Sequence, residues 1–237
     1  MPQIAVMNES TVINDAAVQQ MLPAFDHQWN TDLKPIWGLD AATFTFIPAN
    51  QMPPSSSWWV VFLDNSDQAG ALAYHDLTNE GLPISKVFVK TLQDDNASVS
   101  VGATHEICEM AVDPWLNSAY QDSRGVFWAG EVCDPVESDQ YGYKIGDVLV
   151  TDFVTPDWFG HKFAQGTVTD LQRHARTQFE ILSGGYAQIF DATRGWQQVT
   201  GSKAKATHRA HAAEGSRRER RARTWQNWVR SEVRFDR

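Results

Sequence analysis

The chain has 237 residues, of which 42% are hydrophobic, and its 10 Trp and 12 Phe supply enough apolar material for a sizeable core. This composition excludes a mostly disordered protein. The net charge of −9 is unevenly distributed, because residues 1–200 hold 9 Lys and Arg against 25 Asp and Glu, whereas residues 201–237 hold 11 against 4. An acidic body is a poor general binder of nucleic acid, so that class is excluded for residues 1–200.

The cysteine count and the lack of long apolar runs exclude two further classes of protein. Only Cys108 and Cys133 are present, which rules out a disulfide framework and a multi-cysteine zinc site. The opening residues MPQIAVMNES contain neither a basic region nor a useful apolar run, and no later stretch approaches 18 apolar residues. We therefore expect a soluble protein without a signal peptide or a membrane partner, located in the cytoplasm.

The first part of the chain predicts a β-α-β-β order. Residues 3–7 are typical of a short strand, and Asn14 or Asp15 is a suitable cap for a helix over 16–37. Alternating and then continuous apolar residues predict two more strands, over 43–49 and 58–64. The second of these, WWVVFLD, is apolar throughout, which favours the middle of a sheet.

Two more strands are predicted over 71–77 and 86–90, separated by the turn sequence TNEGLP. A helix over 97–112 follows, and Asp113-Pro114 should end it, because the residue before proline is disfavoured in the α region. Strands followed by this helix predict an α+β fold in which a mixed sheet supports the helix.

The rest of the chain predicts a smaller β-rich part. Residues 126–137 form an acidic cluster beside aromatics, and residues 143–153 have strand character. A terminal antiparallel meander is expected over 178–182, 186–190 and 196–199. We divide the chain into a first domain over 1–140, a β-rich part over 141–200 and, since the composition changes at Gly201, a basic tail over 201–237.

The chemistry is concentrated in the 97–112 helix and the residue that ends it. At about 100° per residue, one face of this helix carries His105, Glu106, Glu109 and Asp113. Burying several carboxylates costs free energy unless positive charge compensates them, and a divalent metal would do so. His105-Glu106-x-x-Glu109 has the spacing of the H-E-x-x-H zinc helix with the second histidine replaced by glutamate. A carboxylate ligand also makes manganese, iron or calcium acceptable beside zinc.

The order of elements and this motif resemble the zincin-like metallopeptidase fold over roughly residues 1–140, in which an edge strand, here KVFVK, precedes the active-site helix. The segments THEICEM and EVCDPVE are also similar to those of an uncharacterised group of bacterial and phage proteins. The metzincin pattern would require a third ligand at position 115, which is Trp. The gluzincin pattern instead takes a glutamate from a second helix, which implies Glu131 as the third metal ligand. Asp134 and Asp113 would then support the ligands from the second shell.

Several other histidines and acids are not predicted to bind the metal. We expect His75 to be structural and Asp152 to end a strand, and His27, His161 and His174 have no spacing that indicates a ligand. Cys108 and Cys133 lie beside proposed ligands, so their sulfurs should be close if the two segments converge. Two buried thiols acting as small hydrophobic groups are the alternative.

The basic tail combines an arginine run with Trp225 and Trp228. Its pattern is compatible with an amphipathic helix that binds an acidic partner, with nucleic-acid binding, or with a solvated extension.

Together these features predict a metal-dependent hydrolase of the metallopeptidase type. His105, Glu109 and Glu131 would hold the ion, Glu106 would act as the general base, and residues 86–90 would bind a peptide or protein substrate by strand addition. The alternative is a non-catalytic, zincin-shaped structural or binding protein, such as a phage virion or assembly component.

Overall fold

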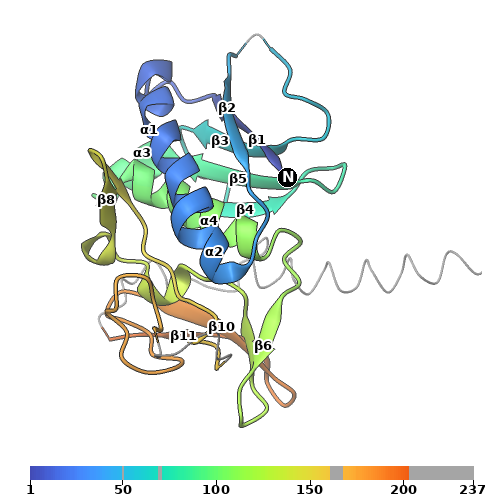
Figure 1. The fold of residues 1–237 in the computed structure, drawn as a ribbon, viewed down its shortest axis with the longest axis vertical. Coiled ribbons are helices and arrows are strands. Elements are labelled where there is room, and N and C mark those ends of the chain that lie inside the picture. Colours follow the sequence, from blue (N-terminus) through green and yellow to red (C-terminus); the bar gives the residue numbers. More distant parts are fainter. Residues whose placement is uncertain (50, 69–70, 161–167, 203–237) are drawn as a thin grey trace, which may run out of the picture.

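The structure is a computed structural model that describes residues 1–49, 51–68, 71–160 and 168–202. The predicted α+β class is confirmed. Within the described residues, a five-stranded mixed sheet, a four-stranded sheet and a two-stranded hairpin are combined with few helices. Figure 1 shows the five-stranded sheet with its helices at one end of the molecule and the four-stranded sheet at the other.

The larger sheet forms the platform of the fold. Its strands occur in the order β2-β1-β3-β5-β4, and every pairing is parallel except that of β4 with β5. The strands are β1 (Gln3–Asn8), β2 (Thr43–Ile47), β3 (Trp58–Leu63), β4 (Ala73–Leu77) and β5 (Pro83–Phe88). The apolar strand β3 lies in the middle, as predicted, because it is hydrogen-bonded to β1 on one side and to β5 on the other.

The first helical segment consists of three consecutive helical pieces instead of one regular α-helix. Helix α1 (Asp15–His27) is followed without a break by the π-helical turn η1 (Gln28–Leu33) and by α2 (Lys34–Trp37). The side chain of Asn14 caps α1 by accepting the amide of Ala17 at 2.9 Å, as its position predicted. Gly38, with a φ of 68°, ends α2 in the left-handed conformation that glycine adopts without strain.

The prediction that residues 86–90 form the edge strand is wrong. Strand β5 begins at Pro83 and is hydrogen-bonded to β3 on one side and β4 on the other, so it is an internal strand. Val89 and Lys90 already belong to the short helix α3 (Val89–Asp94). The hairpin turn after Leu77 returns the chain antiparallel, and this places β4 at the edge of the sheet.

Helix α4 (Val99–Val112) carries the predicted motif and packs against β4 and β5. Ser98 caps its start, and Asp113 ends it directly before Pro114. The Oγ of Ser85 donates to the backbone carbonyl of Glu106 at 3.3 Å, which ties α4 to β5. The Oγ of Thr104 accepts the amide of Thr151 at 2.9 Å, which ties α4 to the later part of the chain.

The four-stranded sheet has the order β11-β10-β7-β6 and joins segments that are distant in sequence. Its strands are β6 (Ala119–Gln121), β7 (Phe127–Ala129), β10 (Tyr186–Asp191) and β11 (Gly195–Thr200). Between them lie the 3-10 turns η2 (Asp134–Val136) and η3 (Asp139–Tyr141) and the hairpin of β8 (Tyr143–Ile145) with β9 (Val148–Val150).

The predicted strand over 178–182 is wrong, because these residues are irregular and Phe179 has a φ of 58°. Their polar backbone atoms are used in long-range contacts: the carbonyl of Glu180 accepts Trp158 Nε1 at 2.8 Å, and the amide of Leu182 donates to the carbonyl of Pro135 at 2.9 Å. Tertiary contacts thus override the local strand pattern.

Among the residues that the structure describes, none of the helices is both long and apolar enough to cross a membrane. The predictions for His161 and for the basic tail beyond Ser202 lie outside the described residues.

Candidate metal centre

Helix α4 supplies three side chains of the centre from one face. His105, Glu106 and Glu109 are all buried, with residue exposures of 5%, 2% and 0%. The helix is also apolar on its remaining sides, where Ile107 and Met110 belong to the core. A helix that is buried on every side holds its polar residues in fixed positions, so the spacing in the sequence becomes a fixed geometry.

Strand β4 supplies a residue that sequence reasoning did not assign to the site. His75, interpreted from the sequence as structural, is fully buried, and its Nδ1 lies 3.3 Å from Glu106 Oε2. The antiparallel edge strand crosses close to α4, which brings the imidazole to the carboxylates of the helix. No fixed sequence spacing links His75 to the motif, so only the pairing of β4 with β5 could have indicated its position.

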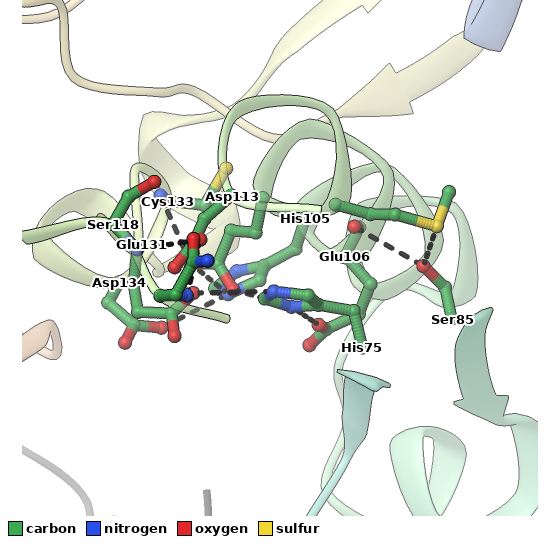
Figure 2. Close-up of polar contacts among 12 residues, drawn as sticks. His75, Ser85, His105, Glu106, Asp113, Ser118, Glu131, Cys133 and Asp134 are labelled. Carbon is green, nitrogen blue, oxygen red and sulfur yellow. Dashed lines mark hydrogen bonds and ion pairs between the residues drawn. The ribbon is translucent and has the colours of Figure 1, made fainter. Parts of the chain in front are cut away.

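The third contribution comes from residues 131–136, which follow β7. Glu131 is in an irregular stretch and Asp134 begins the turn η2, so the second helix that the gluzincin resemblance implied for Glu131 is absent from this described segment. Long-range backbone hydrogen bonds hold the segment instead, from Val154 to the carbonyl of Val132 and from Leu182 to that of Pro135. Glu131 and Asp134 are nevertheless buried next to α4, as Figure 2 shows.

Two groups of ligand-type atoms result, and Glu109 belongs to both. In the first, His105 Nε2 lies 3.2 Å from Glu109 Oε1 and 3.2 Å from Asp134 Oδ1. Asp134 is therefore as close to the imidazole as the predicted ligand Glu109. In addition, the backbone amide of Cys133 donates to Glu109 Oε1 at 3.3 Å, which fixes the orientation of that carboxylate.

The second group is formed by His75, Glu109 and Glu131. His75 Nδ1 lies 3.7 Å from Glu109 Oε2, and His75 Nε2 lies 3.8 Å from Glu131 Oε2. In each group, one ligand atom from every member lies within 4.8 Å of the others. The structure thus brings all the predicted ligands into one cluster, but it adds His75 and pairs Glu131 with His75 in this group.

The electrostatics of the cluster favour a bound cation. Burial opposes the charged form of His105, yet the negative charge of Glu109 and the hydrogen bonds that the imidazole makes to Asp134 and Glu109 raise the pKa of the imidazole well above its ordinary value of 6.5. The carboxylates therefore attract positive charge strongly enough to hold a proton on a buried ring. A divalent ion would compensate the same negative charge.

The donor set fits a metal ion of intermediate hardness. Buried imidazole and carboxylate groups of this kind can hold a divalent ion, and the mixture is acceptable to zinc, manganese and iron. Calcium prefers a shell made only of oxygen atoms, so the two histidines make it a poorer fit.

Asp113 and the two cysteines surround the cluster. Asp113 Oδ1 accepts the amides of Asn117 and Ser118 at 2.8 and 2.9 Å, so this carboxylate organises the loop after α4. Its predicted second-shell role stays a prediction. Cys108 and Cys133 are both free and buried, and their side chains are in hydrogen-bonding contact, as expected if the two segments converge. Burial and the contact with Cys108 raise the pKa of Cys133 well above its ordinary range.

A separate cluster is formed by Asp152, Asp170 and His174, whose ligand-type atoms also lie within 4.8 Å of one another. Its carboxylates are used by the backbone: Asp152 Oδ1 accepts the amide of Phe153 at 2.8 Å, and Asp170 Oδ2 accepts that of His174 at 2.7 Å. Burial and a hydrogen bond with Asp170 raise the pKa of Asp152 to about 9. We therefore interpret this cluster as a structural group in which Asp152 keeps its proton.

Comparison of the chain with protein-family models, curated proteins and solved structures gives no significant match, so the assignment of this centre depends on its own geometry.

Proposed function

We propose that the protein is a metal-dependent hydrolase of the metallopeptidase type. The observation that carries this proposal is the convergence of two imidazoles and four carboxylates from β4, α4 and the 131–136 segment in one buried cluster. Glu109 and the two histidines would hold a divalent ion together with Glu131 and Asp134. When bound, such an ion lowers the pKa of water and polarises a carbonyl oxygen.

Glu106 is the residue of the cluster best placed to move a proton. It follows His105 directly on α4, and its Oε2 lies 3.3 Å from His75 Nδ1, at the side of the cluster formed by β4. A carboxylate in this position would accept a proton from the attacking water and return it to the leaving amine. His75 would orient Glu106 for this transfer through the short contact between them.

The substrate class follows from the edge of the sheet. An extended peptide can add to a sheet only at an edge strand, and β4 is the edge strand nearest to α4. We therefore propose that Ala73–Leu77, in place of residues 86–90, binds a peptide or protein substrate. An antiparallel edge strand beside the motif helix also supports the proposed zincin-like arrangement.

The proposal is tested with Glu106→Gln, and the exposed residue change Glu80→Gln serves as a matched control. Peptide cleavage would be followed by mass spectrometry on a mixed peptide pool with zinc or manganese present. We expect Glu106→Gln to lower the cleavage rate by about 10²–10⁴-fold, the usual contribution of a general base, with metal content and melting temperature unchanged. Cleavage at the unaltered rate would rule out Glu106 as the base.

A non-catalytic protein, such as a virion or assembly component, is the second candidate. The observation that favours it is burial, since the side chains of the six cluster residues are only 0–7% exposed. In that case the ion would stabilise the fold, and Glu106→Gln would have no effect on any hydrolytic activity. Chelation would lower the melting temperature in both cases and does not separate them.

A further inference from the structure

We infer that this centre binds two divalent ions, bridged by the carboxylate of Glu109. One ion would bind His105 and Asp134, and the other would bind His75 and Glu131. The inference rests on the proposed metal site and extends it from one ion to a pair.

The first argument is the orientation of Glu109. Its Oε1 faces His105 Nε2 at 3.2 Å, whereas its Oε2 faces His75 Nδ1 at 3.7 Å. The two oxygens of one carboxylate thus point to two different imidazoles that come from different elements, α4 and β4. A carboxylate that offers one oxygen to each side has the arrangement of a bridge between two ions about 3.5–4 Å apart.

The second argument is the division of the remaining acids. Asp134 Oδ1 is 3.2 Å from His105, and Glu131 Oε2 is 3.8 Å from His75. Each histidine therefore has its own carboxylate in addition to the shared Glu109. Ligand atoms around a tetrahedral ion with bonds of 2.0–2.2 Å lie about 3.3–3.6 Å apart. In each group, one ligand atom from every member lies within 4.8 Å of the others, so small side-chain movements would bring either group to first-shell spacing.

The third argument is charge. Glu106, Glu109, Glu131 and Asp134 are four carboxylates with side chains at most 3% exposed. The nearby lysines Lys86 and Lys90 form ion pairs elsewhere, with Asp67 at 2.6 Å and with Asp94 at 2.8 Å. One divalent ion would offset only half of the negative charge, whereas two would balance it with both histidines neutral, as metal ligation requires.

A second ion would also give the cluster a defined chemistry. When bound, one ion of such a pair would lower the pKa of the attacking water, and the other would polarise the carbonyl oxygen of the hydrolysed bond. Glu106 contacts His75, so the base lies on the side of the second group. This arrangement suits an amide or ester bond of a peptide substrate.

The experiment measures the metal stoichiometry of the full chain by equilibrium dialysis against zinc, followed by elemental analysis. The wild type should bind two equivalents. His75→Ala should lose the ion shared with Glu131, and Asp134→Asn should lose the ion shared with His105, so that each variant binds one. Asp152→Asn is the matched control outside the centre and should keep two. Circular dichroism confirms that each variant is folded, and Glu131→Gln replaces His75→Ala if that variant does not fold.

Manganese provides a second readout that is independent of activity. Two Mn²⁺ ions that share a carboxylate should give a spin-coupled paramagnetic resonance spectrum in the wild type and an uncoupled spectrum in each single-site variant. One equivalent with an uncoupled spectrum would overturn the paired centre and leave the proposed hydrolase intact. No bound metal would overturn both proposals, and loss of two equivalents in Asp152→Asn would place the ions elsewhere.

Discussion

The centre is built by two regions that fix their side chains in different ways. In β4 and α4, regular hydrogen bonding sets the positions of His75, His105, Glu106 and Glu109. In the 131–136 segment, Glu131 lies in an irregular stretch and Asp134 begins the short turn η2, and the backbone is held by contacts to the amides of Val154 and Leu182. The conformation of the 131–136 segment therefore depends on hydrogen bonds to distant parts of the chain, whereas the conformation of α4 is set by hydrogen bonds within the helix.

This difference indicates where the centre is most easily disturbed. A change within α4 is absorbed by a helix that has its own caps and core contacts. A change in β10 or in the turn before it should move Glu131 and Asp134 directly, because the backbone at Gly185 packs against the backbone of η2. The following predictions compare the two regions, beginning with the largest effect.

The same substitution, glycine to alanine, should destabilise the protein in the irregular region and have little effect in α4. A Cβ at Gly185 would lie 2.5 Å from the carbonyl oxygen of Pro135 and 2.8 Å from that of Asp134, so the backbone of η2 would have to move. We expect Gly185→Ala to lower the free energy of unfolding by about 1–3 kcal/mol and to weaken metal binding.

Gly102→Ala in α4 is the matched variant. Its Cβ would meet only the side-chain carbons of Leu92, the nearest at 2.9 Å, and these can rotate away. Because alanine favours a helix interior by roughly 0.5–1 kcal/mol over glycine, we expect little net change in stability and unchanged metal binding. Thermal melting and metal dialysis measure both variants, and equal losses would refute the contrast between the regions.

Stability should depend on pH through Asp152, which belongs to the later part of the chain. Its pKa rises from an ordinary 3.8 to about 9, because burial and Asp170 favour the protonated acid. The folded protein then keeps a proton that the unfolded chain releases, so this contribution is full below about pH 4 and is lost as the pH rises through about 9. Asp152→Asn should flatten the decline, measured by denaturant unfolding at a series of pH values. An unchanged pH profile would contradict the assignment.

Removing the cap of α4 should have a moderate effect. Ser98 accepts the amide of Val101, and Ser98→Ala should lower the free energy of unfolding by about 1 kcal/mol while the metal stoichiometry is preserved. Ser55→Ala, in an exposed loop, is the control and should change stability by less than about 0.5 kcal/mol. Loss of metal from Ser98→Ala would mean that α4 is less independent than proposed.

The smallest effect is expected at the two cysteines. Burial and the contact with Cys108 raise the pKa of Cys133, so its thiol should not react with iodoacetamide in the folded protein at neutral pH. Mass spectrometry should show alkylation of Cys133 only after unfolding. Rapid labelling of the folded chain would show that the 131–136 segment opens readily.

The sequence alone was sufficient for the part of the centre that α4 contributes. The helical period placed His105, Glu106 and Glu109 on one face of a helix that ends at Asp113, and this follows from local geometry alone. The central position of β3 could likewise be predicted, because a continuous apolar run is typical of a strand in the middle of a sheet. The proximity of Glu131 and Asp134 to this helix was expected only from the family resemblance.

Only the tertiary structure decided the rest. Strand pairing made β4 the edge strand and brought His75 into the centre, and no spacing along the chain encodes that contact. Long-range backbone hydrogen bonds shaped the 131–136 segment and removed the predicted strand over 178–182. Local periodicity specifies which face a residue occupies, whereas the partner of that face is chosen by packing between segments far apart in sequence.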